Sequence, residues 1–475
     1  MPDLPQHDFG SDVGLLDPLR QYVDAGSKTD DAAWLAALVE VELALTRALI
    51  DVGLAPEWMA AVTDALEDHG AIDLHAVARE SRGGGNPVIP LVKHLGRAAE
   101  ALHEGASDHI HVGATSQDIL DTAAMIIASR VGGATRDALG ELADRLAALA
   151  ESHRSTPMAG RTLGQQASPT SFGLVAASWL SALLTARERI DGVLEELPAQ
   201  YGGAVGNLAV LTEVVSSRRP DADPGAVVDD VRTAFAARLG LRSPEIDWHT
   251  DRTPVVAFAN ALGCALGAVG AFALDVTVLA RTEIGEVTER LGAGEGGSSA
   301  MPHKRNPVTA VLIVAAARRG PGLLSTLHGS MLAEDQRPSG AWHAEWQALR
   351  ELEEATLAAT CAAASLAGRL EVDDMQMRAN LELTDGLIFS ERVSAILAES
   401  LGQRAAFDLV ESASREAVDT RRPLRVVLTG SLSSSGADER LRERVWNAFE
   451  PDSALGHADR LITHVLERYA KEKHT

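Results

Sequence analysis

Apolar residues recur at every third or fourth position along most of this chain, the spacing that places them on one face of an α-helix. The first clear example is the series Trp34, Leu38, Val41, Leu45 and Leu49. We expect this helix to begin at Thr29 or Asp30, either of which can cap it, and to end near Gly53. Shorter helical stretches follow as far as residue 102. The pattern therefore predicts a first, small helical domain over residues 1–111.

From residue 112 to residue 368 the same spacing extends over much longer stretches. Five long helices are predicted, over residues 118–152, 170–197, 253–285, 307–332 and 341–370. The first is expected to be loosened at Gly132 and Gly133, and the fourth to be disturbed at Gly320-Pro-Gly322. Long helices with apolar residues on more than one face are typical of an elongated bundle that is also buried by other subunits. Residues 112–368 are therefore predicted to form a central bundle.

Beyond residue 368 the helical stretches become short again. Helices are expected over residues 375–381, 388–401 and 405–420, followed by a helical tail over residues 441–469. Residues 369–475 thus form a third, small helical domain. Runs of β-branched residues are scarce and aromatic residues make up only 4% of the chain. The predicted fold class is therefore all-α, with three helical domains around a central bundle of five long helices.

Composition and charge narrow the environment and the partners. The stretch 254–274 has no charged side chain, but it is rich in Ala and Gly and runs directly into Asp275, which favours a core helix over a membrane span. The first residues lack the basic and apolar regions of a signal peptide, so we expect a cytoplasmic protein. The net charge is −24 and no basic stripe with aromatic residues is present, which argues against nucleic acid as a partner.

One stretch, residues 292–307, combines features that suit a small carboxylate-bearing substrate. Four glycines within residues 292–297 relax the backbone, and Ser298 and Ser299 follow with two hydroxyl groups. Lys304 then supplies positive charge, and Asn306 with the next residue, a proline, is expected to cap and start a helix. The alternative is a simple Gly/Ser linker before a helix.

Three further segments carry polar groups that can bind such a substrate. In residues 111–118, Thr115 and Asp118 either form a capping box or, with Ser116 and Gln117, hold a carboxylate. Residues 160–169 form either a polar connector or a binding segment, whose candidate ligands are Arg161, Thr162 and Gln165.

The last segment, residues 334–346, lies ahead of the fifth long helix. Arg337 can bind a second carboxylate, and His343 is either an acid, a base or a core histidine, with structure favoured. Trp342 and Trp346, four residues apart, are expected in the core or a subunit interface rather than against a ligand.

The sequence contains no metal-ligand spacing, phosphate-binding loop or dinucleotide fingerprint, so no cofactor is expected. A serine hydroxyl becomes an effective base only where oriented N–H groups and cations stabilise its alkoxide. The reaction class that this combination suits is proton transfer at a carbon next to a carboxylate.

The sequence of residues 297–307 resembles the signature of the fumarase/aspartase superfamily, which includes the adenylosuccinate and argininosuccinate lyases. The resemblance covers nearly the whole chain. It implies a homotetramer with a twenty-helix core, in which each active site draws on three subunits. It further implies that Ser299 is the catalytic serine, and that the substrate, a small di- or tricarboxylate, is bound by Thr115, Ser116, Gln117, Arg161, Thr162, Gln165, Ser298, Met301, Lys304, Asn306 and Arg337.

Details favour one branch of this superfamily. Adenylosuccinate lyases usually carry histidines where this chain has Leu163 and the glycines of residues 82–90. The strings at residues 111–121 and 340–346 instead resemble the 3-carboxy-cis,cis-muconate cycloisomerases of the β-ketoadipate pathway. These enzymes commonly have an acidic residue where this chain has Gln336. Two alternatives therefore stay open: a C–N lyase that releases fumarate from a substituted succinate such as nitrosuccinate, and a catalytically silent helical oligomer.

Overall fold

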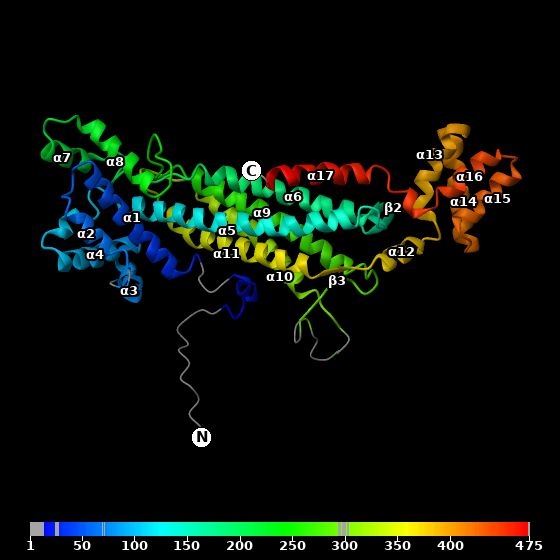
Figure 1. Ribbon diagram of the computed structural model, residues 1–475, viewed down its shortest axis with the longest axis horizontal. Coiled ribbons are helices and arrows are strands. Elements are labelled where there is room, and N and C mark those ends of the chain that lie inside the picture. Colours follow the sequence, from blue (N-terminus) through cyan, green and yellow to red (C-terminus); the bar gives the residue numbers. More distant parts are fainter. Residues whose placement is uncertain are drawn as a thin grey trace, which may run out of the picture. The chain divides into compact units, whose positions relative to one another are not determined.

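The computed structural model describes residues 14–23, 28–68, 70, 72–292, 296, 301 and 304–473. Helices dominate these residues, so the predicted all-α fold class is confirmed (Figure 1). The chain divides into two compact units. Unit 1 contains Met1–Ala138, Ala186–Gly267 and Ala315–Cys361, and unit 2 contains Leu139–Thr185, Ala268–Val314 and Ala362–Thr475. The division into three domains at residues 111 and 368 stays a prediction.

One part of unit 1 is a cluster of shorter helices around one longer helix, and it includes two helices from residues 209–238. The longer helix is α1 (Asp31–Asp51), and the Asp30 carboxylate caps it by accepting a hydrogen bond from the Ala33 N–H at 2.8 Å, as the sequence predicted. Helix α1 packs against several of its neighbours. The other elements are η1 (Pro18–Tyr22), α2 (Met59–Ala65), α3 (Leu74–Gly84), α4 (Val88–Leu102), η3 (Ala106–His109), α7 (Ala209–Arg218) and α8 (Pro224–Arg238).

The five long helices are present, close to the predicted ranges. They are α5 (Ser116–Ser152), α6 (Phe172–Leu194), α9 (Thr253–Leu279), α10 (Val308–Gly329) and α11 (Ala341–Gly368). Two expectations were wrong: α5 continues through Gly132 and Gly133, and α10 continues through Pro321. A Cβ atom on Gly132 would lie 2.6 Å from Cδ2 of Leu194. This glycine therefore permits close helix packing rather than loosening the helix.

The segment between α5 and α6 is a β-hairpin, where the sequence predicted only a polar connector. Strands β1 (Pro157–Thr162) and β2 (Gln165–Ser171) pair antiparallel. Leu163 and Gly164 at the turn both have positive φ, 50° and 79°, as a two-residue turn of this handedness requires. A second short pair joins β3 (Val287–Glu289) to β4 (Leu370–Val372), also antiparallel.

The C-terminal part of unit 2 is a set of short helices with a core of its own. Residues such as Val393, Leu397, Leu428 and Val445 fill this core. The tail expected to be helical over residues 441–469 consists of two helices, because the chain leaves the first after Asn447 and forms a 3-10 turn at Pro451. The elements are α12 (Asp374–Glu382), η4 (Leu387–Phe389), α13 (Ser390–Leu401), α14 (Gln403–Thr420), α15 (Leu424–Ser434), α16 (Glu439–Asn447) and η5 (Pro451–Ser453). The last helix, α17 (Ala458–Lys473), instead contacts α6, where Arg468 donates to Thr185 at 3.0 Å. The sequence reading missed α15.

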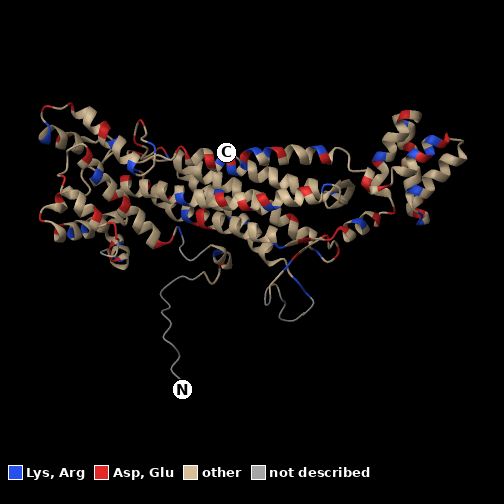
Figure 2. Cartoon of the chain, in the orientation of Figure 1, with Lys and Arg blue, Asp and Glu red and all other residues tan. Residues whose placement is uncertain are grey.

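Two helices among the described residues, α9 and α10, are long and apolar enough to cross a membrane by length and composition alone. Core helices of soluble proteins pass the same test, and 50% of the most apolar part of α9 is buried within this chain, against 28% for α10. Apolar side chains such as Leu274 and Val311 remain exposed. Figure 2 shows Lys and Arg mixed with Asp and Glu along the helices of both units.

Candidate active site

The start of α5 in unit 1 is organised by one buried carboxylate, that of Asp118. It accepts hydrogen bonds from the backbone N–H of Thr115, Gly202 and Gly203, each at 2.9 Å, and lies 2.7 Å from Nε2 of His249. The capping role predicted for Asp118 is therefore confirmed. Because this carboxylate holds the loop, the hydroxyl groups of Thr115 and Ser116 are not needed to cap the helix and can serve other contacts.

Arg337 lies against these groups. Its Nε donates to Oε1 of Gln117 at 3.0 Å, and its Nη2 donates to Oγ1 of Thr115 at 2.9 Å and to the Ala204 carbonyl at 3.3 Å. All three acceptors are uncharged, and Arg337 forms no ion pair with any residue that the structure describes. A guanidinium held by neutral acceptors beside the N-terminus of a 37-residue helix is suited to bind a carboxylate. The structure thus brings together Thr115, Gln117 and Arg337, as well as the adjacent Ser116.

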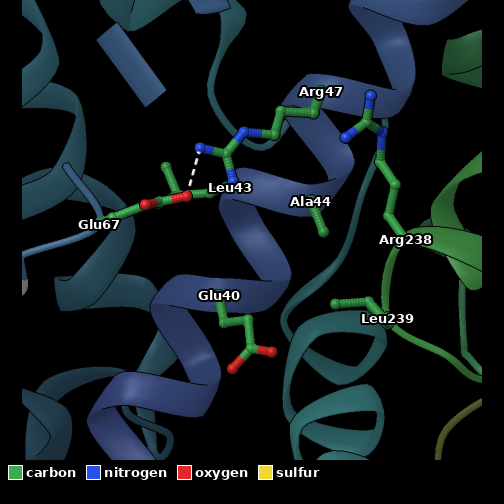
Figure 3. Close-up of a pocket in the computed structure, with 7 residues that line it drawn as sticks. All are labelled: Glu40, Leu43, Ala44, Arg47, Glu67, Arg238 and Leu239. Carbon is green, nitrogen blue, oxygen red and sulfur yellow. Dashed lines mark hydrogen bonds and ion pairs between the residues drawn. The ribbon is translucent and has the colours of Figure 1, made fainter. Parts of the chain in front are cut away.

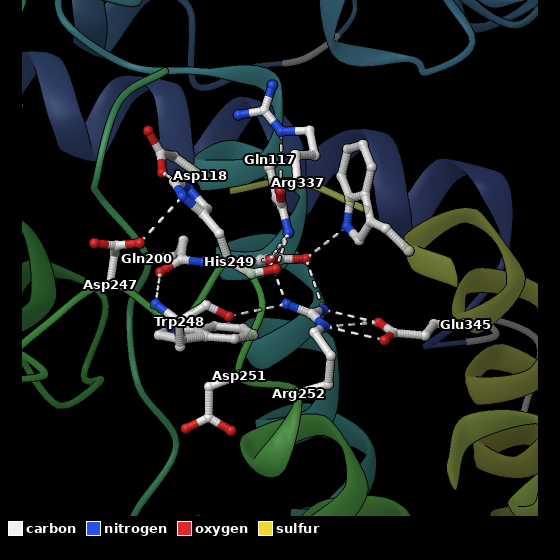
Figure 4. Close-up of polar contacts among 12 residues, drawn as sticks. Gln117, Asp118, Gln200, Asp247, Trp248, His249, Asp251, Arg252, Arg337 and Glu345 are labelled. Atoms are coloured by element: carbon white, nitrogen blue, oxygen red, sulfur yellow. Dashed lines mark hydrogen bonds and ion pairs between the residues drawn. The ribbon is translucent and has the colours of Figure 1, made fainter. Parts of the chain in front are cut away.

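A buried polar network supports Gln117 from below (Figure 4). Its Nε2 donates to Asp121 at 3.1 Å and to the His249 carbonyl at 2.8 Å. Asp121 also accepts from the Trp342 indole and from Arg252, and Arg252 in turn contacts Glu345. Through Gln117, these contacts link Arg337 to the buried charged groups of the core.

Arg252 and Glu345 are both buried at the base of this network. Burial by itself lowers the pKa of the Arg252 guanidinium, but the charges and hydrogen bonds of Asp121 and Glu345 outweigh it and raise that pKa. Burial likewise raises the pKa of the Glu345 carboxyl, against the opposing effect of Arg252. Trp342 is in the core, as predicted, whereas His343 is exposed with its ring 4.6 Å from that of Trp346.

His249 is buried between two carboxylates. Its Nε2 contacts Asp118, and its Nδ1 lies 3.2 Å from Oδ2 of Asp247 without hydrogen-bond geometry. Sequence reasoning missed this residue, because Asp247 and His249 stand in an irregular segment far along the chain from Asp118.

A second histidine, His111, faces the buried carboxylate of Glu42 in α1. The distance from its Nδ1 to Oε1 of Glu42 is 2.7 Å. Burial acts to lower the pKa of His111, but the charge and hydrogen bond of Glu42 and the charge of Asp118 overcome it, so the pKa is raised. Sequence reasoning quoted His111 but gave it no role. One signal for this contact was available in the sequence: Glu42 is an acidic residue among the apolar positions of α1.

The candidates in the hairpin belong to unit 2. Arg161 forms a two-pronged ion pair with the fully buried Glu286, at 2.9 and 2.6 Å, and Asn380 also donates to Glu286 at 2.8 Å. In this arrangement the charge of Arg161 has a protein partner. Thr162 and Gln165 flank the exposed turn of the hairpin. Their substrate-binding roles stay predictions.

The signature loop also belongs to unit 2, and Ser298 and Ser299 lie outside the described residues. Met301 and Lys304 are exposed. Asn306 was expected to cap the following helix, but its Nδ2 donates to the Gly296 carbonyl at 3.2 Å. Helix α10 begins at Val308, one residue later than predicted. Its N-terminus is capped by another carboxylate, Glu289, which accepts from the Thr309 N–H at 3.2 Å.

Unit 1 also has a cavity of about 320 Å³ beside α1 (Figure 3). Two arginines line it, but Arg47 is paired with Asp64 and Glu67, and Arg238 is paired with Asp51. Because these charges are compensated, we do not favour this cavity as a carboxylate site. Among the residues that the structure describes, no group of three or more His, Cys, Asp or Glu is arranged to hold a metal ion.

Comparison with known proteins places this geometry in a family context. A family described as lyase matches residues 24–322 of the chain. A nitrosuccinate lyase of Streptomyces davaonensis is 43% identical over 462 residues, covering 95% of this chain and 96% of the relative. A 3-carboxy-cis,cis-muconate cycloisomerase of Pseudomonas aeruginosa is 41% identical over 470 residues, covering 99% of this chain and 98% of the relative.

Solved structures agree with these matches. The crystal structure of a 3-carboxy-cis,cis-muconate lactonizing enzyme from Pseudomonas putida superposes with a TM-score of 0.86 at 36% identity. The superposition covers 96% of this chain and 99% of that structure.

Proposed function

We infer the activity of this chain from one premise: the chain belongs to the lyase family of the fumarase/aspartase superfamily, and it is an enzyme of the cycloisomerase or lyase type. The resemblance of residues 297–307 to the superfamily signature is thereby confirmed. Enzymes of this superfamily act on small carboxylate substrates and are typically oligomeric.

We propose that the chain is a cofactor-independent 3-carboxy-cis,cis-muconate cycloisomerase. The observation that carries the assignment to a carboxylate substrate is the Arg337 guanidinium held by Thr115 and Gln117 at the start of α5, with no ion-pair partner among the described residues. It provides a fixed positive charge for one carboxylate of a multiply charged substrate. The similarity to the Pseudomonas cycloisomerase and lactonizing enzyme supports this choice of substrate.

In this reaction a carboxylate oxygen of the substrate forms a C–O bond to one carbon of a conjugated double bond. The electron pair of that double bond moves to the neighbouring carbon, which lies next to a second carboxylate, and that carboxylate absorbs the charge as an aci-carboxylate. A proton then bonds to the carbon, so no atom is lost. We assign the anion contact to Arg337 and the polar contacts to Thr115, Ser116 and Gln117, and we propose Ser299 as the group that transfers the proton.

The second candidate is a nitrosuccinate lyase, favoured by the 43% identical relative from Streptomyces. Here a base removes a proton from the carbon next to a carboxylate, and the electron pair forms the double bond of fumarate. The C–N bond breaks and nitrite leaves with its electron pair. The same aci-carboxylate develops in both reactions, so the same Arg337 contact serves either substrate.

We further propose a cytoplasmic homotetramer whose active sites combine residues of different subunits. One observation supports the assembly: apolar residues such as Val311 of α10 are exposed in the single chain. A monomer in light scattering would contradict the shared sites.

An ultraviolet assay separates the two substrates. Purified protein is mixed with 3-carboxy-cis,cis-muconate and the diene absorbance is followed; a parallel reaction with nitrosuccinate is analysed for fumarate and nitrite. Loss of the diene absorbance supports the cycloisomerase, and fumarate with nitrite in equal amounts supports the lyase. The variant Ser299→Ala should lose activity by about 10² or more, because the proton-transfer group is removed. Full activity in this variant would refute the role of Ser299.

A further inference from the structure

The carboxylate of Glu42 occupies a position that packing alone does not explain. It lies on α1 between Val41 and Leu43, and all three side chains are buried. Glu42 itself is fully buried, and its Oε2 forms no hydrogen bond with any residue that the structure describes. An apolar residue of similar size would fill this space at a lower desolvation cost. The carboxylate therefore needs a reason other than the stability of α1.

The other oxygen of Glu42 supplies that reason. Its Oε1 accepts a hydrogen bond from Nδ1 of His111 at 2.7 Å, and this short contact is typical of a charged pair. The His111 side chain is still 20% exposed, and its Nε2 forms no hydrogen bond with a described residue. The backbone of His111 has a φ of 59°, a left-handed conformation that is uncommon outside glycine. The loop thus holds the ring with one nitrogen fixed and the other available.

The groups that face His111 come from three segments. Glu42 of α1 and Asp118 of α5 are acidic and act together to favour the charged ring. Tyr201 donates to the neighbouring Val112 carbonyl at 2.9 Å, and burial, followed by the charges of Asp118 and Glu42, raises the pKa of its phenol. Tyr201 thus stays neutral at physiological pH. Two carboxylates thus act on the ring, and no cation among the described residues counts among the causes that shift its pKa.

His111 also lies beside the proposed anion site. It stands four residues before Thr115, whose hydroxyl accepts from Arg337 and whose N–H is held by Asp118. Asp118 is therefore shared between the loop that carries His111 and the start of α5. A charged imidazole here would add a second donor to the one provided by Arg337.

We propose that Glu42 is a positioning residue that keeps His111 in its doubly protonated form, with Nε2–H directed at the substrate carboxylate that absorbs charge during the reaction. This inference rests on the proposed function, because it assigns His111 to the same site. Glu42 does not touch the substrate and acts only through His111. No proton leaves His111 during the step; the ring donates a hydrogen bond that strengthens as the aci-carboxylate forms.

The sign of the pH dependence follows from the raised pKa. The active form is the protonated ring, so activity is present at low pH and is lost as the pH rises through the pKa of His111. The variant Glu42→Gln keeps the shape of the side chain and a hydrogen-bond acceptor but removes the charge. The pKa of His111 should fall, and the basic limb of the kcat/KM profile should move to lower pH. On that limb we expect kcat/KM about tenfold lower than in the wild type, the effect of losing one charge-assisted hydrogen bond.

The test combines a measurement without substrate and one with it. Hydrogen–deuterium exchange at the imidazole Cε1, read by mass spectrometry of the peptide containing His111, reports the titration of that ring in the full-length protein. Glu42→Gln should lower the pKa so measured, and Glu42→Asp, which restores a carboxylate, should recover part of the shift. The matched control is Glu80→Gln, because Glu80 contacts His94 at 3.2 Å on the surface and should leave His111 unchanged.

Two results overturn the proposal. One is an unchanged titration of His111 in Glu42→Gln; the other is a changed titration with a pH profile identical to that of the wild type. Failure of the proposed function is recognised separately, because then neither 3-carboxy-cis,cis-muconate nor nitrosuccinate is converted by the wild-type protein. The exchange measurement still decides in that case whether Glu42 controls the charge of His111.

Discussion

Replacement of Arg252 by methionine should strongly destabilise the protein, because this residue is the only cation described in the network below the site. Its guanidinium is 1% exposed and lies within 2.8 to 3.2 Å of oxygens of Asp121 and Glu345. Methionine fills a similar volume but leaves both carboxylates without their charged partner. Asp121 keeps its hydrogen bonds from Gln117 and Trp342, whereas Glu345 has no other hydrogen bond to a described residue.

The size of the effect follows from this difference between the two carboxylates. Removing one partner from a buried ion pair costs about 3–5 kcal/mol, mainly because a buried charge remains uncompensated. A loss of 3 kcal/mol changes the unfolding equilibrium more than a hundredfold, at about 1.4 kcal/mol for each factor of ten. Glu345 can reduce the loss by taking up a proton, since burial already raises the pKa of its carboxyl. The double variant Arg252→Met/Glu345→Gln should therefore lose about 1–3 kcal/mol less than the sum of the two single variants.

Urea unfolding at a single protein concentration measures these free energies without confusing them with subunit association. A matched control is Arg415→Met, which breaks an exposed ion pair with Glu411 and should change stability by less than about 0.5 kcal/mol. A loss below about 1 kcal/mol for Arg252→Met would refute the reasoning. Additive effects in the double variant would show that Glu345 does not depend on Arg252.

Three further outcomes are expected. Gly132→Ala should destabilise the protein by about 1–3 kcal/mol in urea unfolding, because the added Cβ would clash with Leu194. The control Gly133→Ala, whose Cβ would have nothing within 4 Å, should be neutral or stabilising by up to about 1 kcal/mol. Burial raises the pKa of the Glu353 carboxyl, so the stability of the protein should fall as the pH rises through that pKa. The variant Glu353→Gln should abolish this decline, measured by thermal unfolding between about pH 5 and pH 9. A decline of unchanged slope in the variant would contradict the prediction. Arg337→Lys should raise the KM for the proposed carboxylate substrate about tenfold, because lysine keeps the charge but cannot bind two oxygens in parallel; an unchanged KM would argue against this contact.

Much of the fold could be predicted because a helix is reflected in the spacing of apolar residues that are close together in the sequence. The repeat of apolar positions located the five long helices, and the short polar side chain of Asp30 identified the start of α1. Errors arose where the outcome depended on distant residues. Gly132 suggested a weak point in its helix, but its small size is used to let Leu194 and another helix approach.

In the candidate site, too, some features could be predicted from local sequence and others depended on distant residues. The residue types indicated that Thr115 and Gln117, in one segment, and Arg337, in another, could each contact a carboxylate. That the three side chains lie together was seen only in the tertiary structure. The sequence did not reveal that Arg161 is paired with Glu286, because the two residues are 125 positions apart and no local pattern links them. The same reason hid the partners of His249 and His111.

By itself, then, the sequence determined the helical architecture and the chemistry available to the protein, because helix periodicity and side-chain charge are properties of neighbouring residues. The tertiary structure decided which of those charges are compensated and which remain available. Burial and pairing distinguish Arg337, held by neutral oxygens, from Arg161 and Arg252, which are bound to carboxylates. Whether an ionisable group binds a substrate or stabilises the fold depends on what surrounds it in space, and residues distant in the chain supply those surroundings.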